Sequence, residues 1–262
     1  MLDQLSRSAI LSRMTRPEFL PGVDAAHVTE RLRLAGGKEI ESGKLLSPES
    51  SAALAVNTFG WFASRPHLLP PFPGQAFEAP PREVEVEYCA RFPWRGGRHP
   101  WLDAVVETPG KLIGVELKRC EPFRDRKLAS LSDAYDRPVW GSTMRPYEDM
   151  RDRLRKVPNA FRYLDAAQLV KHAFGLVTDG ARKQKPATLV YLFAEPSQLA
   201  GRPIPPETLE EHRREVAEFE AAVAGAGVVF HALSYRTWLD SWSSTSPEIA
   251  SHADAVLARF DP

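Results

Sequence analysis

HPWLDAVVETPGKLIGVELKR, residues 99–119, predicts two short strands joined by a tight turn. The strands are expected at Leu102–Glu107 and Lys111–Lys118, with Pro109 and Gly110 in the turn. Because side chains two residues apart in a strand point to the same face, the second strand has two different faces. Its apolar face, which we expect to pack into a core, consists of Ile113, Val115 and Leu117.

The opposite face of this hairpin carries groups that suit the binding of a cation and a phosphate. Glu116 and Lys118 share that face with Gly114, and Asp103 lies on the preceding strand. Mg²⁺ usually takes one or two carboxylates together with water and substrate phosphate. Asp103 and Glu116 are therefore the predicted metal ligands, with the backbone carbonyl of Leu117 as a third. Lys118 would help to lower the pKa of the metal-bound water and would neutralise charge as hydroxide attacks phosphorus. Gly114 would let a nucleic-acid backbone approach closely.

The arrangement of Pro100, Asp103, Glu116 and Lys118 resembles the PD-(D/E)XK nuclease superfamily, to which many restriction endonucleases belong. Two residues separate the proline from the aspartate, a departure at the least constrained position of that motif. Three further segments resemble a bacterial group of restriction endonucleases within the superfamily: Ser50–Phe62, Asp165–Leu176 and Leu189–Pro196. The resemblance covers residues 48–196 and implies DNA as the substrate.

Ser47, Pro48 and Glu49 indicate the start of a helix that continues through Ser50–Phe62, because serine caps, proline suits the first turn and glutamate favours the positive end of the helix dipole. The superfamily often places a glutamate of its first helix near the metal. Glu49 is the nearest candidate for that role, although its place in the capping turn favours a structural one.

Asn159–Val177 predicts a second helix, on which Asp165, Gln168 and His172 share roughly one face. The superfamily commonly places a polar or basic residue of this helix beside the active site. Gln168 is therefore the candidate orienting group among the catalytic residues, and a solvated helix face is the alternative. His172 is the second candidate for this role, although a structural role is the favoured interpretation for it.

The remaining segments predict more of a sheet. Glu83–Tyr88 alternates between apolar and acidic residues and is the expected first strand. Glu87 is the acid of this strand most suited to point at the metal site. A strand face with three acids more usually faces solvent. Ala187–Glu195 is almost continuously apolar, as expected of an interior strand. Residues 119–158 show little periodicity and are expected to line the cleft.

Composition is that of an ordinary globular protein. The chain has 262 residues, of which 43% are hydrophobic and 26% charged. It contains neither a transmembrane run nor a signal-peptide core, so we expect a cytoplasmic protein without membrane contact. Cys89 and Cys120 are too few for a zinc site or a disulfide framework. Balanced charges, 34 basic and 34 acidic residues, argue against a non-specific DNA coat but allow a local basic groove.

The predicted fold is α/β, with a central mixed sheet flanked by helices. Residues 1–46 are expected to form an arm or short helices, and residues 47–262 a nuclease-like domain. Its αβββαβ core, of the restriction-endonuclease type that the resemblance implies, lies at about 47–196. A C-terminal elaboration at 197–262 adds a helix at Pro203–Ala224 and a strand at Val228–Leu233.

The predicted function is that of a Mg²⁺-dependent DNA endonuclease of the restriction type, with Mn²⁺ as a substitute metal. A homodimer is expected if the enzyme cuts both DNA strands, because two strands require two active sites. The first alternative is a nucleic-acid-binding protein on the same fold that does not cut. The second is a structural α/β protein in which Glu116 and Lys118 form a surface ion pair. Burial distinguishes them, since a concave, partly buried carboxylate pair with raised pKa values supports a site.

Overall fold

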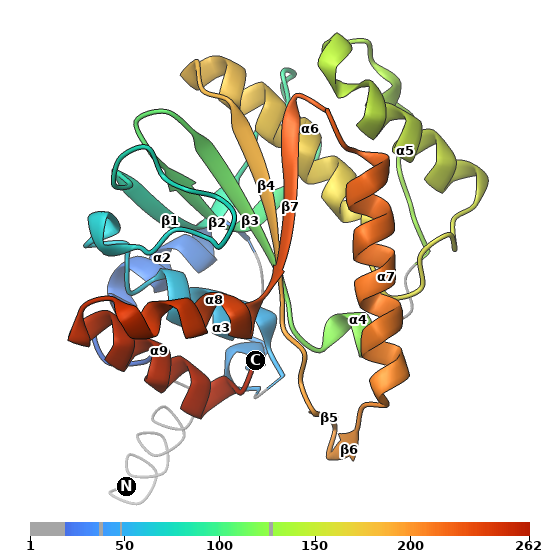
Figure 1. Ribbon diagram of the computed structural model, residues 1–262. Coiled ribbons are helices and arrows are strands. Elements are labelled where there is room, and N and C mark those ends of the chain that lie inside the picture. The colour runs from blue at the N-terminus through green and yellow to red at the C-terminus, as the bar shows by residue number, and fades with distance from the viewer. Residues whose placement is uncertain (1–18, 37–38, 48, 126–127) are drawn as a thin grey trace, which may run out of the picture.

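The computed structural model describes residues 19–36, 39–47, 49–125 and 128–262. Its centre is a five-stranded mixed sheet of order β1-β2-β3-β4-β7 (Figure 1). The first three strands are antiparallel neighbours, and β4 and β7 run parallel to β3. The strands are β1 (Glu83–Cys89), β2 (Trp101–Glu107), β3 (Leu112–Lys118), β4 (Ala187–Phe193) and β7 (Val228–Ser234). A separate hairpin consists of β5 (Gln198–Leu199) and β6 (Arg202–Pro203).

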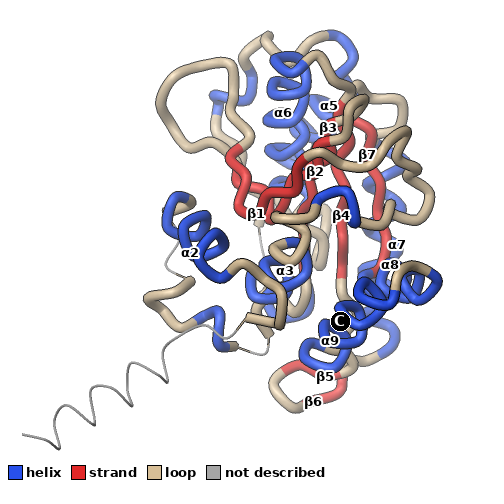
Figure 2. Tube along the Cα trace, turned by 90° about the vertical axis from the view of Figure 1, so that its left-hand side faces the viewer, coloured by secondary structure: helices blue, strands red, loops and turns tan. Residues whose placement is uncertain are grey.

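One face of the sheet packs on three helices that come from both ends of the chain: α3 (Ser51–Phe59), α8 (Tyr235–Asp240) and α9 (Pro247–Phe260). Ile113, Val115 and Leu117 lie in this core, which confirms the predicted apolar face of the hairpin. Helix α2 (Ala25–Leu34) lies beside the edge strand β1 (Figure 2). Burying this face removes apolar surface from water, which stabilises the folded state by roughly 25 cal/mol for each Å² buried.

Helices α6 (Ala166–Lys183) and α7 (Pro206–Ala222) cover the opposite face, and α5 (Arg145–Lys156) packs against α6. Helix α6 approaches β3 closely at Gly114. An added Cβ there would lie 2.7 Å from a methyl carbon of Leu176 and 2.8 Å from one of Leu102. The prediction that Gly114 admits a nucleic-acid backbone is therefore wrong, because its missing side chain leaves room for α6.

The ends of two helices differ from prediction because other residues cap them. Helix α3 begins after Ser50, whose Oγ accepts the N–H of Ala53, rather than at Ser47; Pro48 lies outside the described residues. Helix α6 begins after Asp165, whose side chain caps it, and it continues to Lys183. The capping group therefore sets the start of each helix.

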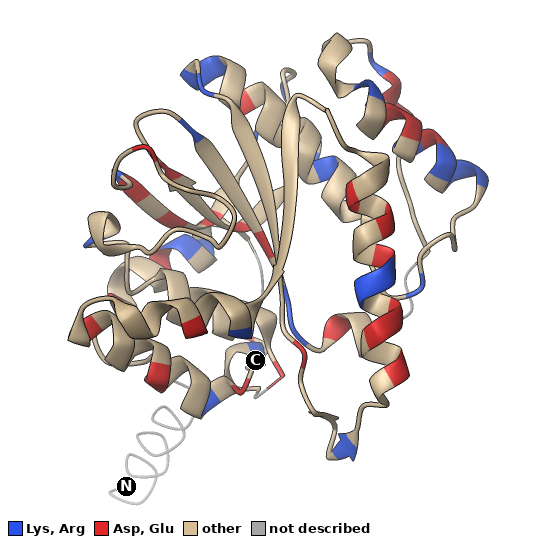
Figure 3. Ribbon diagram, viewed as in Figure 1, with Lys and Arg blue, Asp and Glu red and all other residues tan. Residues whose placement is uncertain are grey.

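The segment expected to be irregular, residues 119–158, contains the twelve-residue helix α5. Most residues of that helix are charged, so its few apolar residues gave no clear helical periodicity in the sequence. The strands differ from it sharply: β4 and β7 carry no lysine, arginine, aspartate or glutamate, whereas α5 and α7 carry both signs of charge (Figure 3). Among the described residues, no helix is long and apolar enough to span a membrane.

Candidate active site

Strands β2 and β3 part at one end of their ladder, and Asp103 lies in the opening. The last paired residues are Ala104 and Val115, and in the same register Asp103 would pair with Glu116. Instead, Oδ2 of Asp103 accepts the backbone N–H of Leu117 at 2.6 Å. The side chain supplies an acceptor where the ladder has ended, since a backbone donor needs a partner. This bond places the Asp103 carboxylate beside Glu116 and Leu117.

Glu116, on β3, is almost completely buried, with 2% of its side chain exposed. Its Oε1 contacts Nζ of Lys118, and its Oε2 lies 3.2 Å from Nδ1 of His172 on α6. Only 12% of the Lys118 side chain is exposed. Glu116 and Lys118 thus do not form the surface ion pair that the second alternative requires.

Glu87 lies opposite Asp103 on the edge strand. Its neighbours Val86 and Tyr88 pair with Ala104 and Leu102, but Glu87 itself forms no ladder pair with Asp103. Its φ of +51° is in the left-handed region, which is strained for a residue with a side chain. Arg31 of α2 donates to the carbonyl of Glu87 at 2.8 Å and thereby supports this conformation.

The electrostatics of the site follow from this crowding of acids. Burial and then the charge of Glu116 raise the pKa of Asp103 to about 8. Burial and then the charge of Asp103 raise the pKa of Glu87 to about 8. Burial disfavours the charged form of Lys118, but Glu116 and Asp103 outweigh it and raise the pKa of the lysine. The crowded acids therefore resist ionising together, and a bound cation would favour their ionised forms.

The donor set fits Mg²⁺ as two carboxylates rather than as a complete protein cage. Among the described residues, no group of three or more histidine, cysteine, aspartate or glutamate side chains is arranged to hold a metal ion. Asp103 and Glu116 provide the one or two carboxylates that Mg²⁺ usually takes from a protein, with water and phosphate completing its coordination. Leu117 follows Glu116 in β3 and donates its N–H to Asp103.

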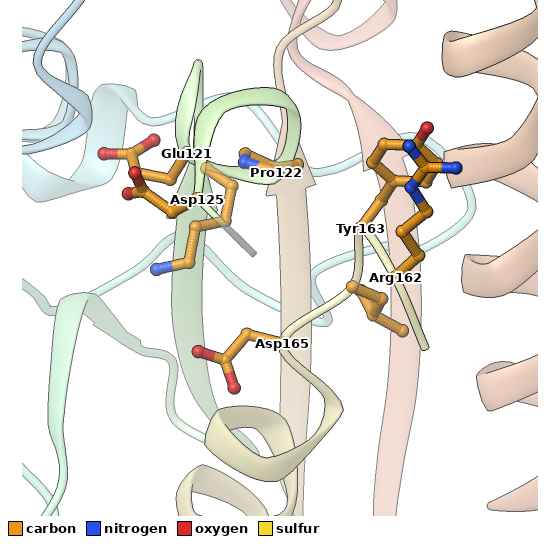
Figure 4. A pocket seen from close by; sticks show the side chains of 8 residues that line it. Glu121, Pro122, Asp125, Arg162, Tyr163 and Asp165 are labelled. Atoms are coloured by element: carbon orange, nitrogen blue, oxygen red, sulfur yellow. The ribbon is translucent and has the colours of Figure 1, made fainter. Parts of the chain in front are cut away.

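A groove leads past Lys118. One part, of about 370 Å³, lies between the start of α3 and helix α4 (Glu121–Arg124), and its lining includes Ser51, Lys118, Glu121 and Gln168. The adjoining part is lined by Lys118, Asp165 and Tyr163, among others. Figure 4 shows Glu121 and Asp125 together on one side of this part, with Arg162 and Tyr163 across from them. The lysine is thus accessible from a concavity although its carboxylate partner is buried.

Sequence reasoning missed Glu121, which lies at the groove directly after β3. Its Oε1 accepts a hydrogen bond from Ser51 at 2.5 Å, and its Oε2 accepts the N–H of Arg119 at 3.0 Å. Burial alone would raise the pKa of Glu121, but these bonds and Lys118 lower it. In the sequence, Pro122 indicated a helix start next to Glu121, because proline is favoured in the first turn of a helix.

Helix α6 directs its N-terminal half toward the site. Oδ1 of Asp165 caps the helix by accepting the N–H of Gln168 at 3.0 Å. Gln168 lines the groove with Lys118, and His172 contacts Glu116 one turn later. Burial and then the charge of Lys118 lower the pKa of His172 to about 3, so the imidazole is neutral. Glu49 lies at the groove rim, where its Oε1 accepts the N–H of Ala200 at 2.8 Å.

A buried carboxylate on α7 holds the turn that leads into α6. Glu215, which is 6% exposed, accepts three consecutive backbone N–H groups. They belong to Arg162 at 2.6 Å, Tyr163 at 2.8 Å and Leu164 at 2.8 Å. Because these residues immediately precede Asp165, Glu215 fixes where the helix starts relative to the sheet.

One comparison with known proteins gave a match. A family model described as REase-ARP, restriction endonuclease associating with ARP, matches residues 16–259. The matched span includes the hairpin of β2 and β3 and the whole of α6. No curated protein and no solved structure matches the chain.

Proposed function

Because this chain belongs to the REase-ARP family of restriction endonucleases, we propose that it is a Mg²⁺-dependent enzyme that hydrolyses phosphodiester bonds in DNA. One observation carries the proposal: Asp103 and Glu116 lie side by side where β2 and β3 part, with Lys118 between Glu116 and a groove. The burial of this acid pair and the raised pKa of Asp103 support the proposal.

The chain's own residues have separable roles in this proposal. Asp103, Glu116 and the Leu117 carbonyl would hold Mg²⁺, or Mn²⁺ in its place. When bound, the cation supplies a water of lowered pKa and stabilises negative charge on the phosphate. Lys118, kept protonated by its acidic neighbours, would neutralise charge that develops on the phosphoryl oxygens. Gln168, beside Lys118 in the groove, would orient the phosphate or the attacking water.

Plasmid cleavage tests the proposal. Wild-type protein is incubated with supercoiled DNA of several sequences in Mg²⁺, in Mn²⁺ and in EDTA, together with Asp103→Ala and Lys118→Ala variants. We expect cutting only with a divalent cation, and loss of cutting in both variants. Cleavage that persists in EDTA or in both variants would refute the assignment.

A matched control comes from the other end of the same strand. Glu107 on β2 pairs with Lys183 and Lys185, away from Asp103. A Glu107→Gln variant should keep wild-type cleavage, because it removes a carboxylate–lysine contact outside the site. DNA binding measured in parallel by fluorescence anisotropy identifies the non-cutting alternative, since that protein would bind DNA and leave it intact in every metal.

A further inference from the structure

His172 is the buried polar side chain of α6 that faces the proposed metal ligand. Only 3% of its side chain is exposed, and its Nδ1 lies 3.2 Å from Oε2 of Glu116. On the other side of the same carboxylate, Lys118 contacts Oε1. The carboxylate of Glu116 is therefore held from two directions, by its own strand and by a helix that packs across the sheet.

The chemistry of the pair determines the direction of this contact. An ionised carboxylate can only accept hydrogen bonds, so the donor in such a pair is Nδ1 of the histidine. The two atoms lie within hydrogen-bonding distance, but Nδ1 forms no hydrogen bond of good geometry with any residue that the structure describes. Each carboxylate oxygen has more than one lone-pair site, so a contact with His172 leaves Glu116 able to bind a cation. Groups that hold a ligating carboxylate in place commonly tune the affinity of the metal site.

The helix that carries His172 is well anchored. Asp165 caps α6, Glu215 holds the turn before it, and Leu176 packs into the space left by Gly114. His172 lies between these anchors, so its ring has a fixed position relative to β3. A support of this kind is effective because the supporting side chain is itself locked by packing.

We propose that His172 is a positioning residue, which fixes the orientation of the Glu116 carboxylate for a divalent cation. The inference rests on the proposed function, because it presumes that Glu116 is a metal ligand. It departs from the structural role that the sequence favours for this histidine. It assigns to His172 no contact with DNA or with the reacting atoms.

Metal affinity without DNA provides a test that is independent of cleavage. Mn²⁺ binding is followed by electron paramagnetic resonance of the free ion for wild type, His172→Asn and His172→Phe. Asparagine keeps an N–H donor near the position of Nδ1, whereas phenylalanine keeps the ring and loses the donor. We expect His172→Phe to weaken Mn²⁺ binding roughly tenfold or more, and His172→Asn to stay within about threefold of wild type.

His212→Phe is the matched control. His212 is also buried, but its Nε2 lies 3.0 Å from the hydroxyl of Tyr191 on β4, and no contact of it with Asp103 or Glu116 is found within the described part of the chain. This variant should leave Mn²⁺ affinity unchanged. Urea unfolding of every variant shows whether an affinity loss accompanies a general loss of structure.

The outcomes separate the inference from the proposed function. Wild-type affinity in a folded His172→Phe protein would overturn the positioning role and leave the metal site intact. The same result follows if His172→Asn and His172→Phe lose affinity equally, because the donor would then be irrelevant. Absence of Mn²⁺ binding by the wild type would overturn the proposed metal site and the inference together.

Discussion

Replacing Glu215 with glutamine tests how the turn before α6 is held. The carboxylate accepts three backbone N–H groups within 2.6–2.8 Å and is almost completely buried. Glutamine has nearly the same shape, but one of its two terminal atoms is a donor. That NH₂ group would face a backbone N–H group, and the bonds that survive would lose the negative charge of their acceptor.

The expected destabilisation is about 3 kcal/mol. Hydrogen bonds to a charged group contribute roughly 1.5–3 kcal/mol each, and a buried unsatisfied donor costs about 1–3 kcal/mol. At least one bond is lost in the variant, and the others are weakened. For a chain of this size, such a loss corresponds to a decrease in Tm of about 6–12 °C.

Urea denaturation followed by circular dichroism measures this loss, with Glu218→Gln as the control. Glu218 lies on the same helix and pairs with Arg153, but about half of its side chain is exposed. An exposed ion pair contributes less than about 1 kcal/mol. If Glu215→Gln destabilises the protein no more than Glu218→Gln does, the three backbone bonds do not hold the turn.

Three further predictions concern the sheet and its acids. Glu87→Gly should raise the free energy of unfolding by about 1 kcal/mol, because glycine adopts the left-handed conformation without strain; an unchanged or lower value in urea denaturation would contradict this. In EDTA the folded protein should lose stability as pH rises from about 5 to 9. Asp103 and Glu87 have folded pKa values of about 8, well above their values of about 4 in an unfolded chain, so the folded state binds more protons in that window. Asp103→Asn should flatten this pH dependence. A wild-type free energy of unfolding that increases with pH over this range would refute the prediction. Gly114→Ala should cost about 1–3 kcal/mol, because its methyl group meets Leu176, and an added Leu176→Ala should show non-additive rescue in a double-mutant cycle.

The hairpin of β2 and β3 was predictable because strand periodicity places every side chain once the turn is known. Pro109 and Gly110 mark that turn, and the observed strands begin and end within one residue of the predicted ones. The proximity of Asp103 and Glu116 follows from the same register. Periodicity alone could not predict that the two strands part beyond Ala104, where the Asp103 side chain accepts the N–H of Leu117.

Contacts between distant segments were less predictable, because they depend on how helices pack. The shared face of Gln168 and His172 could be derived from helical spacing, but the contact of His172 with Glu116 required the position of α6 on the sheet. Gly114 was misinterpreted for the same reason, since its neighbour Leu176 is far away in the sequence. Glu87 could be named as a candidate, whereas its left-handed backbone conformation has no signal in an alternating strand pattern.

The strand order also implies that the parts of the site form at different stages of folding. Strands β1, β2 and β3 pair with neighbours in the sequence, whereas the pairing of β3 with β4 joins Leu112 to Ala187. Such non-local pairing is slow, because a long loop must close before its contacts form. We therefore expect the two acids and Lys118 to come together on the hairpin before α6 docks with Gln168 and His172. A nascent chain would therefore carry both carboxylates before Gln168 and His172 reached them.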